Sequence, residues 1–323
     1  MRPAPTIVTV GNFDGVHAGH AAILRRAREL AAERNAGGGV VALAFDPHPA
    51  TRLAPERAPE RLTTFEERAE LLRRAGADRV ERLAPTDELL GLSPEAFVEW
   101  VGARHNPRAF VEGADFRFGR GRAGDVQTLR GLGDTRGFGV DVVRPVAAAL
   151  SDHTVVTASS TMTRWLLGRG RVRDAWSVLG RPHALAGTVV RGDRRGRELG
   201  FPTANLDTPN MLPADGVYAA VARLPNGSGR PAALSVGAKP QFNGVDRTAE
   251  AFILDAGPGL PHLPGLPEYG WPLRLELVGW VREQMRFDGV ERLVEQIGRD
   301  CDRVREMVES LTQATLQAHA VTQ

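Results

Sequence analysis

Residues 7–20 of this chain read Ile-Val-Thr-Val-Gly-Asn-Phe-Asp-Gly-Val-His-Ala-Gly-His, and they decide how the first half of the protein folds. The apolar run at 7–10 has the length of a buried strand, and the Ala- and Arg-rich residues 21–35 have a helical pattern. Glycines and histidines therefore fall in the expected turn between a strand and a helix. These residues are Gly11, Gly15, Gly19, His17 and His20.

A turn of this composition can bind an anion. Glycines let backbone N–H groups approach a phosphate, and the dipole of the following helix favours negative charge. The two histidines, spaced His-x-Gly-His, can donate hydrogen bonds to phosphoryl oxygens as charge builds up in a transition state. The alternative is a purely structural strand-turn-helix with incidental histidines. The anion site is the favoured interpretation, because glycines and histidines coincide at a single strand end.

The rest of the first half alternates strand and helix patterns. This alternation is typical of a doubly wound, Rossmann-like parallel sheet, whose ligands bind at the carboxyl ends of the strands. Polar motifs at 11–20, 46–49 and 113–119 each follow a strand directly and would meet at that edge. The expected strands are 7–10, 40–45, 79–83, 109–112 and 140–144, and the expected helices are 21–35, 65–75, 94–104, 125–136, 161–168 and 173–179.

From about residue 181, short apolar segments alternate with Gly- and Pro-rich turns, which predicts a small antiparallel β-barrel. Apolar residues at a helical period over 289–317 predict one long closing helix. We therefore expect an α/β domain at 1–180 and a β domain at 181–323. The expected barrel strands are 184–190, 216–224, 232–236, 250–254 and 273–281.

Bulk properties bound the classes of protein that are possible. With 323 residues, 42% of them hydrophobic, the chain has enough apolar material for two cores. The net charge is only +2, which gives no electrostatic argument for a nucleic acid partner. The one cysteine, Cys301, fits a reducing compartment, and no run approaches the ~20 apolar residues of a membrane span. Because the chain opens on the first strand, we expect no signal peptide and a cytoplasmic location.

The glycine–histidine turn resembles the His-x-Gly-His signature of adenylyl- and cytidylyltransferases. The longer string at 11–20 is similar to that of bacterial bifunctional riboflavin kinase/FMN adenylyltransferases, also called FAD synthetases. Further family motifs follow in order at 45–49, 112–119, 159–164 and 196–205, so the resemblance spans most of the chain. It implies a nucleotidyltransferase domain followed by a riboflavin kinase barrel, which together use ATP to convert riboflavin to FMN and FMN to FAD.

In the first domain, the phosphate of FMN would attack the α-phosphorus of ATP. This nucleophile is already an anion, so catalysis reduces to positioning and charge neutralisation. His17 and His20 suit the ATP phosphates, and Arg164 suits the leaving phosphates. The resemblance assigns Asp115 and Phe116 to the flavin region, although Asp115 could instead cap a turn. The expected nucleotide-binding residues are Gly11, Asn12, Phe13, Asp14, Gly15, Ser159, Ser160 and Thr161.

In the second domain, the ribityl hydroxyl of riboflavin is a poor nucleophile, so a kinase needs a base and a metal ion that shields the γ-phosphate. Thr203 and Asn205, two apart on an extended segment, offer neutral oxygens to Mg²⁺ already bound by ATP. Glu250 opens an apolar segment, and the resemblance makes it the base; the alternative is an exposed glutamate at a strand end. The expected phosphate-loop residues are Gly187, Gly192, Gly196 and Arg197.

Two segments near the expected kinase site depart from the family pattern. Lys239, the single lysine, stands where the family carries Asn, and it either attracts a phosphate or faces solvent. A Pro- and Gly-rich insertion spans 257–270. Two other functions fit the motifs: a related enzyme acting on a modified flavin or with CTP, and a flavin-binding regulator with a degenerate kinase module. The expected partners are therefore small molecules, with a homo-oligomer possible.

Overall fold

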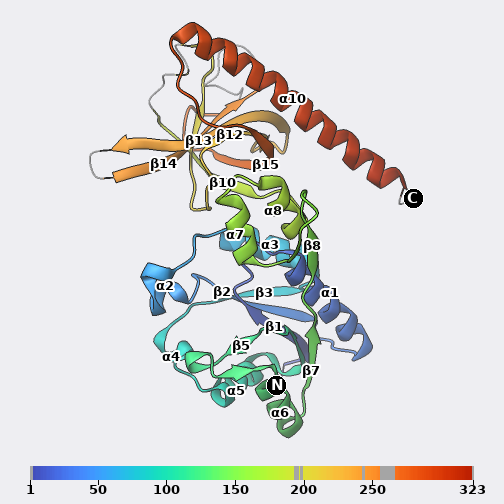
Figure 1. The fold of residues 1–323 in the computed structure, drawn as a ribbon. Helices are drawn as coiled ribbons and strands as arrows, with labels where there is room; N and C mark the ends of the chain where they lie inside the picture. The colour runs from blue at the N-terminus through green and yellow to red at the C-terminus, as the bar shows by residue number, and fades with distance from the viewer. Residues whose placement is uncertain (1–2, 193–195, 197–198, 242–243, 255–265, 322–323) are drawn as a thin grey trace. The chain divides into compact units, whose positions relative to one another are not determined.

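The computed structural model describes residues 3–321 except 193–195, 197–198, 242–243 and 255–265; of residues 239–246, 312 and 314–321 it describes the backbone only. The chain divides into two compact units (Figure 1). The first comprises Met1–Ala149 with His153–Ser160, and the second comprises Leu150–Asp152 with Thr161–Gln323. Each unit has its own hydrophobic core.

The first unit is built on a five-stranded parallel sheet of order β3-β2-β1-β4-β7. Successive residues of β1 and β2 are buried, as expected for a parallel sheet that is covered on both faces. The strand order reverses between β1 and β4, so the switch point lies at the carboxyl ends of these two strands. The strands are β1 (Thr6–Gly11), β2 (Val40–Phe45), β3 (Arg79–Leu83), β4 (Pro107–Gly113) and β7 (Gly139–Val143).

Helices cover the two faces of this sheet. The core cluster on one face contains side chains of α5 (Pro94–His105) and α6 (Val126–Arg136), and the clusters on the other contain side chains of α1 (Ala18–Glu33) and α3 (Phe65–Ala75). Ser93 is the N-cap of α5, since its Oγ accepts the Ala96 N–H at 3.2 Å. Shorter elements are α2 (Ala50–Leu53), α4 (Asp87–Leu90), the 3-10 helices η1 (Pro55–Arg57) and η2 (Arg120–Arg122), and the ribbons β5 (Arg117–Phe118) with β6 (Gly124–Asp125) and β8 (Ala147–Ala149) with β9 (Val155–Thr157).

The second unit is a closed antiparallel barrel of order β10-β11-β14-β13-β12-β15 (Figure 1). The long helix α10 (Val290–Val321) packs outside the barrel through Ile297, Cys301 and Val304. Two short helices precede the barrel, α7 (Ser160–Leu167) and α8 (Val172–Leu179). The strands are β10 (Ala184–Val190), β11 (Ala204–Asp207), β12 (Gly216–Arg223), β13 (Gly229–Gln241), β14 (Gly244–Ile253) and β15 (Pro272–Arg282).

The predicted fold classes of both units are confirmed, and several element bounds are corrected. β11 was not expected as a strand, and β14 begins six residues before Glu250, which therefore does not lie at a strand end. β13 runs on to Gln241, so Lys239 lies in a strand rather than in a loop. Helix α1 begins at Ala18, which places Gly19 and His20 in its first turn instead of in the preceding turn.

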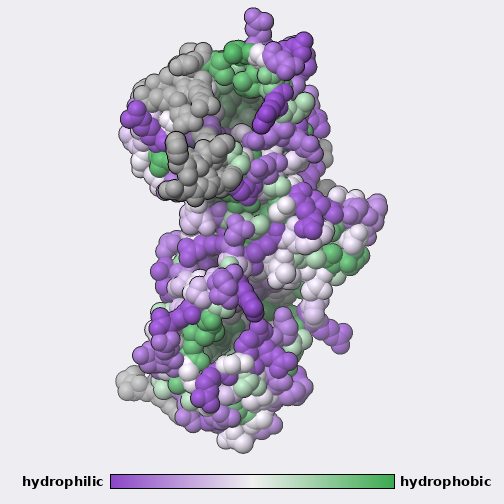
Figure 2. Space-filling view, turned by 60° about the vertical axis from the view of Figure 1, so that its left-hand side comes forward, coloured by the Kyte–Doolittle hydropathy of each residue, from purple (hydrophilic) through white to green (hydrophobic). Residues whose placement is uncertain are grey.

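The surface is mainly polar. On the face drawn in Figure 2, hydrophilic residues predominate and hydrophobic ones gather in separated patches. Large exposed apolar side chains are scattered along the described chain, for example Leu53, Val155 and Met285. None of the helices in the described part of the chain combines the length and hydropathy needed to cross a membrane.

Candidate active sites

The loop between β1 and α1 lies at the switch point of the sheet, and its backbone is unusual. Phe13, Gly15 and Val16 have φ angles of 51°, 79° and 41°. Glycine adopts these values freely, whereas a phenylalanine or valine does so at a cost that its surroundings must offset. The Phe13 side chain is 2% exposed. Its ring packs against Gly11, where an added Cβ would lie 3.2 Å from the ring. Burial of Phe13 therefore helps to hold the loop in this shape.

The two histidines of the motif lie together. Their rings stack with centroids 3.6 Å apart, and Phe13 packs edge-on against His20 at 5.1 Å. His17 is the N-cap of α1: its Nδ1 accepts the Gly19 N–H at 3.2 Å, so the neutral ring carries its proton on Nε2. The first turn of α1 contains no acidic residue, which leaves the positive end of the helix dipole uncompensated. The site is therefore suited to an anion.

A cavity of about 370 Å³ opens beside these rings. It is lined by the end of β1, the start of α1, the end of β4 and the segments 143–146 and 157–159. The structure thus brings together most of the residues predicted for the first site. Those that line the cavity are Gly11, Phe13, His17, His20, Asp115, Phe116 and Ser159.

Three other predicted residues shape the loop. The Asp14 carboxylate is buried and accepts the backbone N–H groups of Leu62 and Thr63, each at 3.0 Å, and the Thr63 hydroxyl at 3.1 Å. The Gly15 N–H donates to the same hydroxyl. The Ser160 hydroxyl donates to the Asp14 carbonyl at 2.7 Å. These bonds tie the loop to segments far along the chain.

Arg68 is a buried loop anchor that sequence reasoning missed. Its guanidinium donates to the carbonyls of Asn12 at 2.9 Å and Phe45 at 2.8 Å, and it contacts Asp46 at 3.3 Å. Burial lowers the pKa of Arg68, and Asp14 and Asp46 act in the opposite direction. In sequence, Arg68 is one of several charged residues of α3, so nothing marks it as the one that turns inward.

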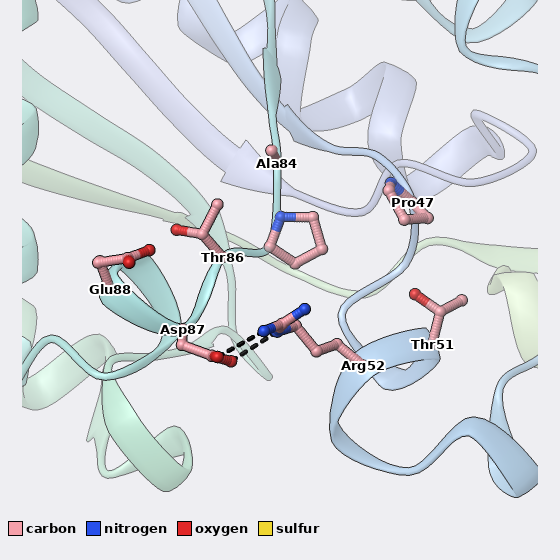
Figure 3. Close-up of a pocket in the computed structure, with 8 residues that line it drawn as sticks. Pro47, Thr51, Arg52, Ala84, Thr86, Asp87 and Glu88 are labelled. Atoms are coloured by element: carbon pink, nitrogen blue, oxygen red, sulfur yellow. Dashed lines mark hydrogen bonds and ion pairs between the residues drawn. The ribbon is translucent and has the colours of Figure 1, made fainter.

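Near the loop, the side chains of Asn12 and His48 are hydrogen bonded at 3.0 Å, and His48 Nδ1 accepts the Ala50 N–H at the start of α2. Beyond them lies an open hollow of about 850 Å³, lined by residues of the α2 and α4 regions. Figure 3 shows the ion pair of Arg52 with Asp87, two of its lining residues. His48 thus helps to hold the start of α2 and contacts Asn12, a predicted nucleotide-binding residue.

The remaining predicted residues of the first site lie on α7. Thr161 is exposed and Arg164 is half-buried, and both belong to the second unit, whereas Ser160 belongs to the first. Their contacts with substrate stay predictions.

In the barrel, strand register places three polar residues in one row. Glu250 of β14 lies opposite Asn205 of β11 on one side and opposite Ser235 of β13 on the other. Directly opposed residues project from the same face of a sheet. Because the neighbours Ala249 and Ala251 are buried inside the barrel, the row lies on its outer face.

The glycine segment packs against this row. A Cβ at Gly192 would lie 2.1 Å from the Asn205 amide nitrogen, and a Cβ at Gly196 would lie 2.3 Å from the Phe201 carbonyl and 3.6 Å from the Thr203 hydroxyl. Only glycine permits such an approach. Gly192, Gly196, Thr203 and Asn205 therefore lie close together, as the sequence predicts.

Two predicted residues of this segment need separate comment. Gly187 lies inside β10, where a Cβ would meet the Asp207 carbonyl at 2.0 Å, so strand packing explains this glycine and the loop begins only after Val190. Arg197 lies outside the described residues, as do the Lys239 side chain and residues 257–265 of the insertion.

A parallel-sheet nucleotidyltransferase unit followed by a six-stranded barrel defines the class of two-domain transferases. Residues 1–159 match the family model described as FAD synthetase, and residues 179–308 match the model described as riboflavin kinase. The chain is 33% identical over 296 residues to the bifunctional riboflavin kinase/FMN adenylyltransferase of Escherichia coli (strain K12), covering 91% of this chain and 90% of that one. The chain belongs to the bifunctional riboflavin kinase/FMN adenylyltransferase family.

Two further proteins are similar to this chain over most of its length. The enzyme of the same name from Listeria monocytogenes serovar 1/2a is 33% identical over 298 residues, covering 91% of this chain and 90% of that one. A solved structure described as a macrolide-efflux protein from Streptococcus pneumoniae has 28% identity and a TM-score of 0.81 and covers 94% of both chains. The fold of 94% of this chain is thus similar to that of a crystal structure.

Proposed function

We propose that the two units divide the synthesis of FAD between them. The barrel phosphorylates riboflavin to FMN with ATP, and the first unit adenylylates FMN to FAD and releases pyrophosphate. The observation that carries this division is the match of two different family models to the two halves of the chain. We place the functional boundary at the predicted position, with adenylyl transfer in 1–180 and phosphorylation in 181–323.

In adenylyl transfer, His17 and His20 donate hydrogen bonds to the phosphoryl oxygens of ATP. Their stacked rings beside the cavity, at the start of α1, support this role. The FMN phosphate needs no base, so the loop acts by positioning and charge neutralisation. Arg164 binds the leaving pyrophosphate. Asn12, Ser159 and Thr161 contact the nucleotide, and Asp115 and Phe116 contact FMN.

In phosphorylation, Glu250 accepts the proton of the ribityl hydroxyl as this oxygen attacks the γ-phosphorus. The backbone at Gly192 and Gly196 lies against the phosphates. The hydroxyl of Thr203 and the amide oxygen of Asn205 would hold Mg²⁺, since both lie beside these glycines and hard oxygen donors suit this ion. When bound, Mg²⁺ neutralises charge on the γ-phosphate.

The test is turnover by the purified full chain. Riboflavin, ATP and Mg²⁺ should yield FMN first and FAD second. Replacement of ATP by CTP, and of riboflavin by modified flavins, separates this function from that of a relative with another nucleotide or flavin. Flavin binding without any phosphorylated product would favour the regulator and contradict the proposal.

We also propose a cytoplasmic location, supported by the single, buried cysteine. Fractionation of the producing cell tests it. A homo-oligomer stays a prediction that light scattering of the purified chain tests.

A further inference from the structure

Glu112 lies where the two central strands of the first unit separate. The ladder between β1 and β4 pairs Ile7 with Ala109 and Val8 with Phe110, and it ends there. Beyond this point the Val10 N–H of β1 donates to a side chain of β4, with Glu112 Oε1 as the acceptor at 2.8 Å. The Glu112 side chain thus fills the gap at the switch point, directly before the glycine–histidine loop.

The environment of this carboxyl group is unlike that of the other buried acids. Glu112 is 2% exposed, the lowest value among the described carboxylates. Asp174 and Asp300 each pair with an arginine, whereas no ion pair reaches Glu112 from the described residues. A buried carboxylate without a cation is costly, which favours the protonated form of this group.

The groups around the cavity agree with a neutral acid. The titratable or charged side chains that line it with Glu112 are His17 and His20 from the loop and α1, Asp115 after β4, and Arg144 after β7. Burial raises the pKa of Glu112 well above its usual range, and the negative charge of Asp115 raises it further. These surroundings therefore favour the neutral, protonated form of the carboxyl group.

Glu112 lines the cavity, and the Val10 N–H occupies only its Oε1 oxygen. The Thr9 hydroxyl also interacts with the carboxyl group and acts to lower its pKa, against the effect of burial. The Oε2 oxygen is not among the polar atoms that are sealed from solvent without a partner. Both substrates of adenylyl transfer are polyanions rich in acceptor oxygens. A carboxylate here would repel them, whereas a carboxylic acid can donate to them.

We propose that Glu112 is a substrate-binding residue that works as a neutral carboxylic acid, its Oε2–H donating to a phosphate or sugar oxygen of the substrate in the cavity. The proposal rests on the assignment of adenylyl transfer to this cavity. ATP and FMN share this acceptor chemistry, and separate KM measurements distinguish them. Loss of the proton at alkaline pH replaces a donor by a negative charge and weakens binding.

The experiment compares the parent chain with Glu112→Gln, whose amide can accept from Val10 and donate to substrate without ever ionising. FAD formation is measured from pH 6 to 9.5 with ATP varied at saturating FMN, and then the reverse. For one substrate, the parent KM should rise about tenfold per pH unit once Glu112 ionises, while kcat changes less. Glu112→Gln should lie within about threefold of the parent at pH 7 and stay flat.

Two further variants complete the design. Glu112→Leu keeps the volume but removes the donor, so its KM at pH 7 should rise about tenfold. Glu70→Gln, on the exposed surface of α3, is the matched control and should follow the parent profile. FMN formation from riboflavin is measured in each sample as a report on the second unit, and a thermal melt reports on folding.

The outcomes separate cleanly. If Glu112→Gln and the parent have the same alkaline profile while the parent forms FAD, the role of Glu112 is wrong and the assigned function stands. If the parent forms FMN but no FAD, the function assigned to the cavity fails and the role of Glu112 fails with it. A flat Glu112→Gln profile against a rising parent KM supports the proposal even if Glu112→Leu does not fold.

Discussion

The two candidate sites are built in opposite ways. The first is centred on one contiguous segment, residues 11–20, whose shape is fixed by buried contacts with distant segments. The second is a row of side chains drawn from β11, β13 and β14, with a glycine segment laid against it. The difference agrees with the proposed chemistry: adenylyl transfer needs oriented donors around phosphates, whereas phosphorylation of a hydroxyl needs a base and a metal ion.

The barrel site should depend most strongly on one residue. Glu250→Gln removes the proposed base and should lower FMN formation from riboflavin by about 10²- to 10⁴-fold. FAD formation from supplied FMN should be unchanged, because the first unit does not use Glu250. Glu283→Gln, at an exposed position after β15, is the control and should leave both rates unchanged. Normal FMN formation by Glu250→Gln would show that Glu250 is not the base.

The loop site should show the converse pattern. His20→Ala removes one donor at the developing charge and should lower FAD formation by about 10²- to 10³-fold, with FMN formation intact. His153→Asn is a matched control, because His153 is exposed in the same unit and asparagine tolerates its φ of 64°. Equal loss of both activities in folded His20→Ala would mean that the two sites are not separate.

Arg68 tests whether distant anchors hold the loop. Arg68→Ala leaves the Asn12 and Phe45 carbonyls without this donor and removes a buried cation that pairs with Asp14 and Asp46. The first unit should lose about 3–5 kcal/mol of stability, and FAD formation should fall at temperatures where FMN formation persists. Thermal unfolding of the full chain, with the transition of each unit compared with the loss of each activity, checks this prediction. Simultaneous melting of both units with wild-type activity ratios would contradict it.

The protonation of Glu112 should make the stability of the first unit depend on pH. Its folded-state pKa is raised, so the proton that stabilises the folded form is released on unfolding above about pH 4.5. The stability contribution is complete below that pH and is lost as the pH rises toward the folded-state pKa. Glu112→Gln should therefore gain stability over the parent by roughly 1.4 kcal/mol per pH unit in this window. Urea unfolding at pH 5, 6, 7 and 8 measures it; a pH-independent difference would count against a neutral Glu112.

The smallest effect is expected in the open hollow of Figure 3. Arg52 and Asp87 are exposed, so solvent screens their ion pair and its loss should leave both activities within about twofold. Steady-state assays of Arg52→Gln against Arg57→Gln, a neighbouring exposed arginine, check this. A large rise in the KM for ATP or FMN would instead mark the hollow as part of the substrate site.

Much of the first unit follows from the sequence because its signals are local. The strand–turn–helix of 7–35, the Ser93 cap and the alternation of patterns each depend on residues close in the chain. The bounds of α1 were missed by three residues because a histidine is not an expected N-cap. Glu112 did carry a signal, a lone acid in an apolar strand, which the motif around it obscured.

The second unit shows which structural features cannot be predicted from local sequence patterns. β11 is only four residues long and half polar, so neither length nor alternation predicts it. Its partner β14 alternates buried Ala249 and Ala251 with outward polar residues, yet small alanines give a weak pattern. The row formed by Asn205, Glu250 and Ser235 depends on strand register between distant segments, and register is a property of the closed barrel.

The distant contacts of the first loop also determine how much of the chain must be synthesised before the loop can adopt its final shape. The loop occupies positions 11–17, but its shape depends on Thr63 and Arg68, and Ser160 adds a bond to the Asp14 carbonyl. Synthesis must therefore pass residue 160 before the loop can make all of these bonds. Until then, the loop at 11–17 lacks some of the contacts that fix its shape.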